Sequence, residues 1–336
     1  MPVIDFHAHW TPVRYREAIA ERGRWLTLGP DAGELHNSGF RMTLQERLAD
    51  MDALGVDLQV LSPTDGFYQY ENELETTVAV SRACNDEIAE IAAAWPARFL
   101  GLGTLPMQDT DAAVAELERA VRSLGLTGVM IGDHVNGATY DDARFTAFWQ
   151  AAQDLGALVF FHQGLGYRYS FDRYFLQNAI GNHVERATTF AVLAEGGVLD
   201  RFGNLKLLFG HGGGYAAWAA ARMEKAQGFF GEDTTDGAVT SGYRPAYKSV
   251  PDPSAEAKLP AGAYLRRFYF DCCTFSGPLL RFLIDNVGAD RVVFGSDAPT
   301  PMVLTNGVRW VRSLDCLTEQ EKRMILSDNA ARLLAR

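Results

Sequence analysis

Short apolar runs alternate with longer amphipathic stretches along the whole chain. The apolar runs are rich in Val, Ile, Leu and Phe, and Gly, Pro, Asp or His residues bound them, which is typical of buried strands. Because few polar residues alternate within them, we expect these strands to be covered on both faces. Eight runs predict strands: VIDFHAH from Val3, DLQVLSP from Asp57, FLGLGTLP from Phe99, GVMIGDH from Gly128, ALVFFHQG from Ala157, LKLLFGH from Leu205, FYFDCC from Phe268 and RVVFGSD from Arg291.

The stretches between these runs carry helix signals. TLQERLADMDALG begins at Thr43, has Glu46 three residues later and stops at Gly55, which predicts a capping box and a glycine C-cap. ENELETTVAVSRACNDEIAEIAAAWP ends at Pro96, and DTDAAVAELERAVRSLG runs from an Asp cap to Gly125. Strands that alternate with helices predict a parallel sheet covered by helices. Eight of them in a chain of this length fit an α/β fold of the closed (β/α)8 barrel type, the TIM barrel.

Two stretches interrupt this alternation. Residues 22–39 and residues 228–262 are rich in Gly, Pro and Asp and have neither helical nor strand periodicity. Long irregular segments in compact proteins are often functional. We therefore expect one barrel domain over residues 1–336, with irregular excursions near 22–39 and 228–262.

Composition limits the classes of partner and the compartment. The net charge of −11 disfavours a nucleic-acid partner, because phosphate binding requires a basic patch. No apolar run reaches the roughly 18 residues of a membrane span, and the first residues lack the basic region of a signal peptide. We therefore expect a cytoplasmic protein that does not bind membranes, with reduced, buried thiols at its four cysteines, Cys84, Cys272, Cys273 and Cys316.

Histidines and one carboxylate stand at the ends of several predicted strands. His7 and His9 occupy alternate positions of the first strand, so both would point into the barrel mouth. His162 ends the fifth strand, His211 the sixth and Asp297 the eighth. Barrel active sites are built at this end of the strands. Neutral imidazoles, a carboxylate and an open position suit a catalytic Zn²⁺ or a similar divalent ion.

These landmarks resemble the amidohydrolase superfamily and, within it, the family of α-amino-β-carboxymuconate-ε-semialdehyde decarboxylase and related aromatic-acid decarboxylases. The resemblance covers nearly the whole chain. It implies a metal-dependent decarboxylase that uses one divalent ion and no organic cofactor. We expect this ion to be Zn²⁺, with Mn²⁺ as the alternative. It depends on the motifs IDFHAH, MDALGVDLQVLS, RFLGLGTLPMQ, GVMIGDHVN, FFHQG, FGNLKLLFGHGGG and GSDAP.

The resemblance also implies roles for the residues at the strand ends. His7, His9, His162 and Asp297 match the metal ligands of the family. His211 matches its catalytic histidine, which lies near the metal-bound water. We therefore expect His211 to act as the acid and base, with Asp297 as a further group that can carry a proton.

Substrate-binding residues follow less directly from the resemblance. Arg41 is a match for an arginine that holds a substrate carboxylate, although the loop after it is shorter than in the family. Arg222 matches a family arginine that reaches the neighbouring subunit's site, which implies a homodimer or a higher homo-oligomer. Without the resemblance, Arg222 is equally well interpreted as a surface cation that faces solvent. Asn178 stands where the decarboxylase has a tryptophan, and Thr300 where it has an aromatic residue. The pocket wall therefore differs from that of the family decarboxylase.

Three functions are compatible with these residues. The first is non-oxidative decarboxylation of an aromatic or unsaturated small-molecule carboxylic acid. The second is a hydrolase or hydratase that acts on a C–C, amide or lactone bond, which the same ligands would support. The third, a non-catalytic barrel with a structural metal, fits less well, because an unliganded His211 suits a reactive water. We expect the aromatic stretch GLGYRYSFDRYF over residues 164–175 to line the pocket.

Overall fold

The computed structural model describes residues 1–29, 38–163, 173–227 and 256–334. Its eight strands form one sheet in the order of the chain, and all neighbouring strands are parallel. Seven strands lie within their predicted runs, and β1 extends one residue beyond its run to Trp10, so the (β/α)8 prediction is confirmed. The strands are β1 (Ile4–Trp10), β2 (Leu58–Pro63), β3 (Phe99–Gly103), β4 (Gly128–Ile131), β5 (Leu158–Phe161), β6 (Lys206–Phe209), β7 (Phe268–Asp271) and β8 (Val292–Val293).

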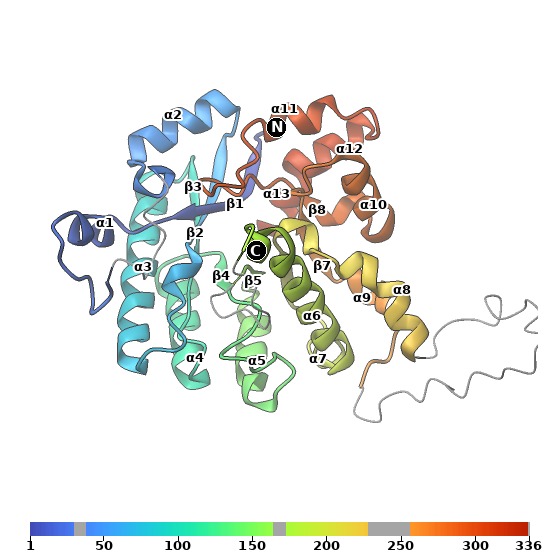
Figure 1. Ribbon diagram of the computed structural model, residues 1–336, viewed down its shortest axis with the longest axis horizontal. Coiled ribbons are helices and arrows are strands. Elements are labelled where there is room, and N and C mark those ends of the chain that lie inside the picture. Colours follow the sequence, from blue (N-terminus) through green and yellow to red (C-terminus); the bar gives the residue numbers. More distant parts are fainter. Residues whose placement is uncertain (30–37, 164–172, 228–255, 335–336) are drawn as a thin grey trace, which may run out of the picture.

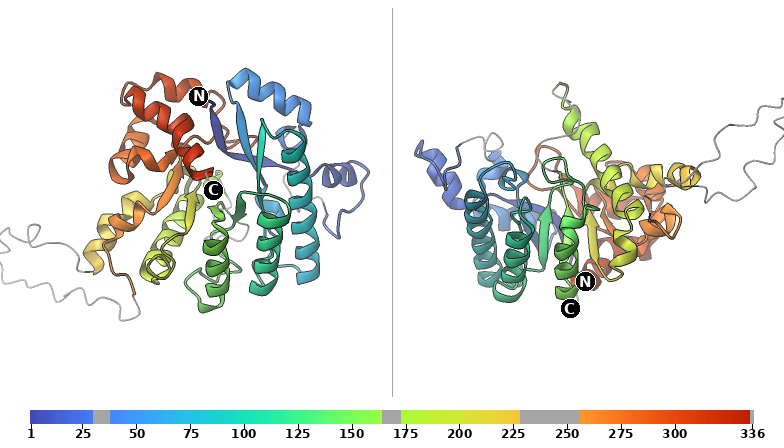
Figure 2. Two further views of the ribbon diagram at one scale, coloured as in Figure 1. Left: turned by 180° about the vertical axis from the view of Figure 1, so that it is seen from behind. Right: turned by 90° about the horizontal axis from the view of Figure 1, so that it is seen from below.

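Helices surround the strands on the outside, as Figures 1 and 2 show. The predicted capping box is present at Thr43, whose side chain accepts from the backbone N–H of Glu46, and Gly55 is left-handed. Asp109 caps the helix that begins at the next residue. The helices are α1 (Val13–Ala20), α2 (Leu44–Leu54), α3 (Leu74–Ala94), α4 (Thr110–Glu118), α5 (Thr146–Leu155), α6 (Asn182–Glu195), α7 (Val198–Arg201), α8 (Ala216–Gln227), α9 (Ala261–Leu265), α10 (Gly277–Val287), α11 (Gly307–Ser313), α12 (Glu319–Arg323) and α13 (Asn329–Leu334).

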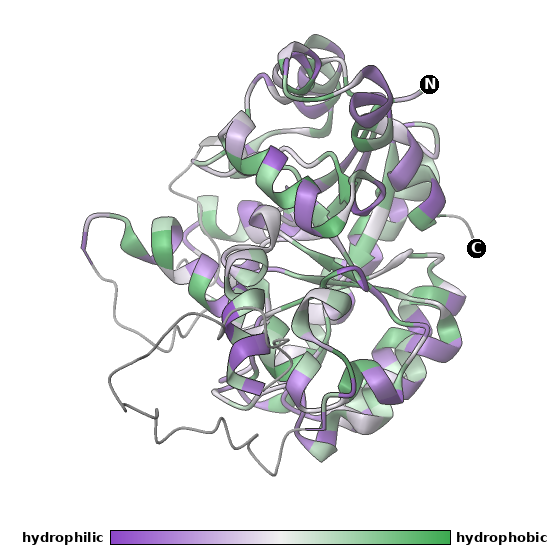
Figure 3. Ribbon diagram, turned by 90° about the vertical axis from the view of Figure 1, so that its right-hand side faces the viewer, coloured by the Kyte–Doolittle hydropathy of each residue, from purple (hydrophilic) through white to green (hydrophobic). Residues whose placement is uncertain are grey.

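The apolar core lies between the strands and this layer of helices. All residues of β4 and β5 are buried, as expected for parallel strands covered on both faces. In Figure 3 the central strands are mostly green, whereas the helices carry green and purple bands. No helix of the described ranges is long and apolar enough to cross a membrane. The four cysteines are free; three are buried as expected, but Cys316 is exposed.

The first and last strands meet through a small number of polar contacts. The backbone N–H of Asp297 donates to the carbonyl of His7 at 2.8 Å. The buried carboxylate of Asp5 accepts from Ser296, from its backbone N–H at 2.9 Å and from its hydroxyl at 2.6 Å. The register of β1 against β2 shifts between Asp5 and Ala8, which is where His7 lies. Asp5 therefore fastens β1 to the segment after β8.

The two predicted excursions are described only in part. Residues 30–37 and 228–255 lie outside the described residues. The 3-10 helix Ser38–Arg41 begins at the end of the first predicted range, and α9 (Ala261–Leu265) begins at the end of the second, so irregular structure does not fill either range completely. The expectation of a single domain over residues 1–336 stays a prediction.

Gly295 keeps the candidate site closely packed. A Cβ atom at this position would lie 2.8 Å from the Cβ of His7 and 2.9 Å from the Cβ of Asp271, closer than carbon atoms tolerate. We predict that Gly295→Ala lowers the free energy of unfolding by about 1–3 kcal/mol through overpacking, measured by urea denaturation. Gly203→Ala is the matched control, because nothing lies within 4 Å of its added Cβ. Equal stability of the two variants would contradict the prediction.

Candidate metal centre

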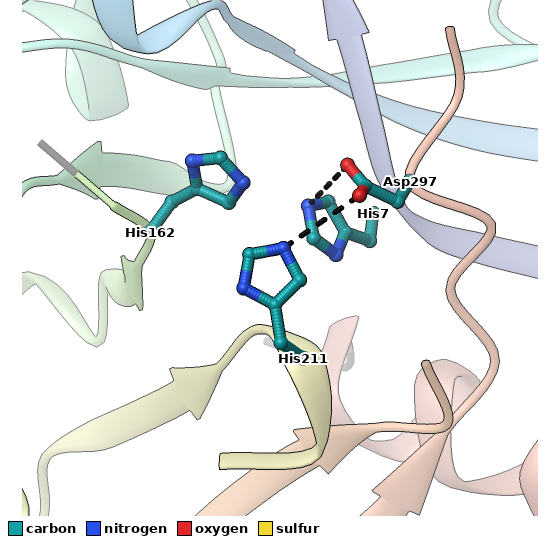
Figure 4. Close-up of side chains that lie close together, drawn as sticks. All are labelled: His7, His162, His211 and Asp297. Atoms are coloured by element: carbon teal, nitrogen blue, oxygen red, sulfur yellow. Dashed lines mark ion pairs between the residues drawn. The ribbon is translucent and has the colours of Figure 1, made fainter. Parts of the chain in front are cut away.

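Four side chains converge at the carboxyl ends of the strands. His7 lies on β1, whereas His162, His211 and Asp297 follow β5, β6 and β8. One ligand atom of each lies within 4.8 Å of those of the others. Figure 4 shows the four side chains gathered around one space, each from a different element. Residues far apart in the chain therefore form one cluster.

His9 belongs to the same cluster. Its Nε2 atom lies 3.1 Å from Nε2 of His7 and 3.4 Å from Oδ1 of Asp297. Its ring centroid is 4.6 Å from that of His162. On the other side of its ring, Nδ1 lies 3.1 Å from the hydroxyl of Ser62, which holds the ring with Nε2 inward. The structure thus brings together all five residues singled out at the strand ends.

The chemistry of this cluster fits a divalent cation. Both ring nitrogens of His162 and Nδ1 of His211 are buried and have no hydrogen-bond partner among the described residues. Oδ1 of Asp297 lies 3.3 Å from Nε2 of His7 and 3.4 Å from Nε2 of His9, in ion-pair contacts. Buried polar atoms are normally satisfied, so unpaired donor atoms that face one space indicate a missing partner. Imidazole and carboxylate are ligands of Zn²⁺ and are compatible with Mn²⁺.

Asp271 is a functional residue that the sequence analysis did not single out. Its Oδ2 atom lies 2.6 Å from Nδ1 of His7, with both side chains fully buried. It also accepts from the backbone N–H groups of His211 and Gly212, each at 2.8 Å. A carboxylate on Nδ1 fixes the ring orientation and leaves Nε2 of His7 directed at the cluster. The sequence feature that could have identified Asp271 is an acidic residue at the end of the predicted strand FYFD.

Burial and neighbouring charges set the protonation of the cluster. Burial, together with the nearby rings of His9 and His7, lowers the pKa of His162 well below its ordinary value. Burial alone would raise the pKa of Asp297, but the charge of His7 and the neighbouring imidazole of His211 hold this pKa well below its ordinary value. A neutral imidazole and an ionised carboxylate are the forms that bind metal ions.

The backbone around the cluster adopts unusual conformations. His211 has φ 56° and Asp297 has φ 61°, in the left-handed region that residues with a Cβ rarely occupy. Gly213 follows with φ 73°, and a Cβ there would lie 2.5 Å from the ring of Phe270. Such conformations cost about 1–3 kcal/mol each and concentrate at functional sites. The run GHGGG is therefore a tight turn that directs His211 toward the cluster.

The three predicted substrate-binding residues lie on other elements. Arg41 is exposed and lines a groove of about 800 Å³ beside α1 and α3. Asn178 is partly buried in the π-helical turn Gln177–Gly181, which leads into α6. Arg222 is exposed on α8. Most of the aromatic stretch over 164–175 lies outside the described residues, because 164–172 are not described.

Comparison with known sequences finds decarboxylases and a hydratase. A 2-amino-3-carboxymuconate-6-semialdehyde decarboxylase from Dictyostelium discoideum is 30% identical over 290 residues, which cover 86% of this chain and 75% of that protein. A 2-keto-4-carboxy-3-hexenedioate hydratase from Sphingobium is 23% identical over 362 residues, which cover 100% of this chain and 97% of that protein.

Solved structures show the same fold. A 5-carboxyvanillate decarboxylase from Sphingomonas paucimobilis matches with a TM-score of 0.80 and 28% identity, over 99% of this chain and 98% of that one. A dihydroxybenzoic acid decarboxylase from Polaromonas, solved with bound manganese and 2-nitroresorcinol, matches with a TM-score of 0.74 and 21% identity, over 99% and 96%.

The family model described as amidohydrolase matches residues 4–336, nearly the full length. The landmarks that carried the resemblance lie within this range, and the barrel and the residue cluster agree with it. The chain therefore belongs to the amidohydrolase family, in its decarboxylase-related branch.

Proposed function

We propose that the protein is a metal-dependent, non-oxidative decarboxylase of an aromatic or unsaturated carboxylic acid. One observation carries the proposal: a buried cluster of imidazoles and a carboxylate, with donor atoms left unpaired, at the catalytic end of a barrel. Decarboxylases among the relatives favour this reaction over hydration. The substrate is accordingly a small-molecule acid.

The proposed ligands are His7, His9, His162 and Asp297, around one divalent ion. Zn²⁺ is the first choice for such a donor set, with Mn²⁺ as the alternative because a structural relative binds manganese. Such an ion would polarise the oxygen atoms of the acid. The protein's own part is to hold the ligands: Asp271 fixes His7, and the hydroxyl of Ser62 fixes His9.

His211 and Asp297 are the proposed proton carriers. Nε2 of His211 lies 3.6 Å from Oδ2 of Asp297, which is too long for a hydrogen bond but places the imidazole and the carboxylate next to each other. In decarboxylation the bond between the substrate carbon and its carboxylate breaks, CO₂ leaves, and the electron pair that stays on carbon takes a proton. A protonated imidazole is a general acid that can deliver this proton from a ring N–H.

The alternative function is that of a hydrolase or hydratase. One relative that matches the whole chain is a hydratase, although at 23% identity. A hydratase would add water to its substrate and release no CO₂, whereas a decarboxylase releases CO₂ and leaves a product one carbon shorter. The products therefore distinguish the two functions.

We predict that His211→Ala retains the metal and loses catalysis. The wild-type protein, loaded with Zn²⁺ or Mn²⁺, is incubated with 2,6-dihydroxybenzoate and with 5-carboxyvanillate, and CO₂ release is measured. The variant should hold about one ion per chain by elemental analysis, while turnover falls by about 10²- to 10⁴-fold, as for loss of a general acid. Loss of the ion from the variant would make His211 a ligand. A hydrated product without CO₂ would support the alternative function.

The exposed side chain of Arg222 leads us to propose a dimer in which each subunit contributes to the active site of the other. This residue is exposed on α8. An acidic protein that binds an anionic acid must supply local positive charge, and arginine can hold a carboxylate with two parallel hydrogen bonds. We therefore propose that Arg222 reaches the active site of the partner subunit in a homodimer or higher homo-oligomer.

Subunit mixing tests this assignment. We predict that inactive His211→Ala and Arg222→Ala proteins regain part of the activity when their subunits exchange, because a mixed dimer has one site without either defect. Exchange is verified by mass spectrometry of tagged chains. Arg122→Ala is the control for loss of an exposed arginine, since 65% of this side chain is exposed, and it should stay active alone. Mixtures that stay inactive despite exchange would place Arg222 in its own site or in folding.

Further assignments rest on the sequence and the family resemblance. Arg41 and Asn178 remain proposed contacts of the substrate. A cytoplasmic location and a single barrel domain are proposed from the composition and from the strand pattern, with no nucleic-acid or membrane partner.

A further inference from the structure

A separate hollow opens beside His211. It has a volume of about 400 Å³ and lies between the turn that carries His211, the start of α8, and the segment from β7 to α10. Helices α8 and α10 contact each other and lie side by side in Figure 1. Its aromatic walls include His183, His211, Tyr215, Trp218, Phe275 and Phe282. We call this hollow the α8–α10 pocket.

The described walls of the α8–α10 pocket combine aromatic with small and aliphatic residues and contain no Lys, Arg, Asp or Glu. The ring centroids of His183 and Tyr215 are 5.3 Å apart, and those of Trp218 and Phe282 are 5.9 Å apart. These rings form two aromatic pairs in the walls of the pocket. An ionised group placed there would lose hydration and would meet no Lys, Arg, Asp or Glu of opposite charge on the described walls, so the walls favour an uncharged ligand.

Large apolar side chains stay exposed at the rim of the pocket. Trp218 is 76% exposed and Phe275 is 48% exposed. Phe275 also has φ 55°, a left-handed conformation that costs free energy in a residue with a bulky side chain. An exposed phenylalanine and a strained backbone both make the folded state less stable. A ligand that covers the ring would remove this apolar surface from water.

The volume indicates the size of that ligand. A cavity of roughly 150 Å³ is enough to hold benzene. About 400 Å³ therefore accommodates a fused second ring or an aryl substituent, and it lies in the range of small-molecule sites. His211 belongs both to this wall and to the metal-centre cluster. The described walls do not include His7, His9, His162 or Asp297, so a group in the pocket lies beside His211.

We propose that the α8–α10 pocket binds the uncharged aromatic extension of the substrate, so that the enzyme prefers fused or aryl-substituted aromatic monocarboxylic acids. Trp218 and Phe275 are the specificity-determining residues. The proposal rests on the proposed function, since it takes the reacting carboxylate to lie beside His211. A second copy of the chain that covers the exposed aromatic rim is the competing occupant.

Binding of two acids of different size tests the proposal. 1-Hydroxy-2-naphthoate and 2-hydroxybenzoate carry the same hydroxyl and carboxylate, and differ by one fused ring. Affinities are measured by titration calorimetry with the metal-loaded full-length protein, and CO₂ release is measured in parallel. We expect the naphthoate to bind about tenfold more tightly than 2-hydroxybenzoate. Trp218→Ala should remove most of this preference without lowering the affinity for 2-hydroxybenzoate. Trp95→Ala is the matched control, because this tryptophan is 39% exposed at the end of α3 and does not line the pocket.

The outcomes separate the pocket from the proposed function. Preferential binding without CO₂ release supports the pocket and contradicts decarboxylation. CO₂ release with equal affinity for both acids, or no binding of either, overturns the pocket. A further outcome is that the Trp218→Ala protein binds both acids with equally reduced affinity and elutes as a smaller species in size-exclusion chromatography. In that case the rim is an interface between copies of the chain, and the proposal is wrong.

Discussion

The contact between Asp271 and His7 is the interaction on which the candidate site depends. Its two atoms lie 2.6 Å apart in a fully buried environment, where a charge-assisted hydrogen bond is strong and an unpaired partner is costly. The same carboxylate holds the backbone of His211 and Gly212. One side chain at the end of β7 thus positions residues from β1 and from the turn after β6.

This arrangement constrains the surrounding barrel. His7 and Asp297 come from opposite ends of the chain, and the carboxylate of Asp5 holds their strands together through Ser296. The absence of a side chain at Gly295 lets His7 and Asp271 approach. Left-handed backbone at His211 and Asp297 adds strain that the rest of the fold must offset. The barrel therefore sacrifices some stability to bring the donor atoms together, which is the pattern expected of an active site.

The sequence predicted the parts that depend on local pattern. Eight apolar runs gave the strands, and the alternation of His7 and His9 gave their common direction, because both signals depend only on residues near each other. Asp271 could not be recognised in this way, since its partner His7 is 264 positions away in the chain. The aromatic rim from Trp218 to Phe275 was missed for the same reason: it forms only when α8 and the segment after β7 come together. The exposure of Cys316 likewise depends on tertiary packing.

The most direct test of this account is the metal affinity of Asp271→Asn. Asparagine has nearly the same size but no charge, and its amide group would face the N–H of His7 and the backbone N–H groups of the turn. With an unchanged circular dichroism spectrum as evidence of folding, the dissociation constant for Zn²⁺ or Mn²⁺ should rise by about 10- to 100-fold, as for loss of a carboxylate that supports a histidine ligand. An unchanged dissociation constant in the folded variant would contradict the claim that Asp271 organises the metal centre.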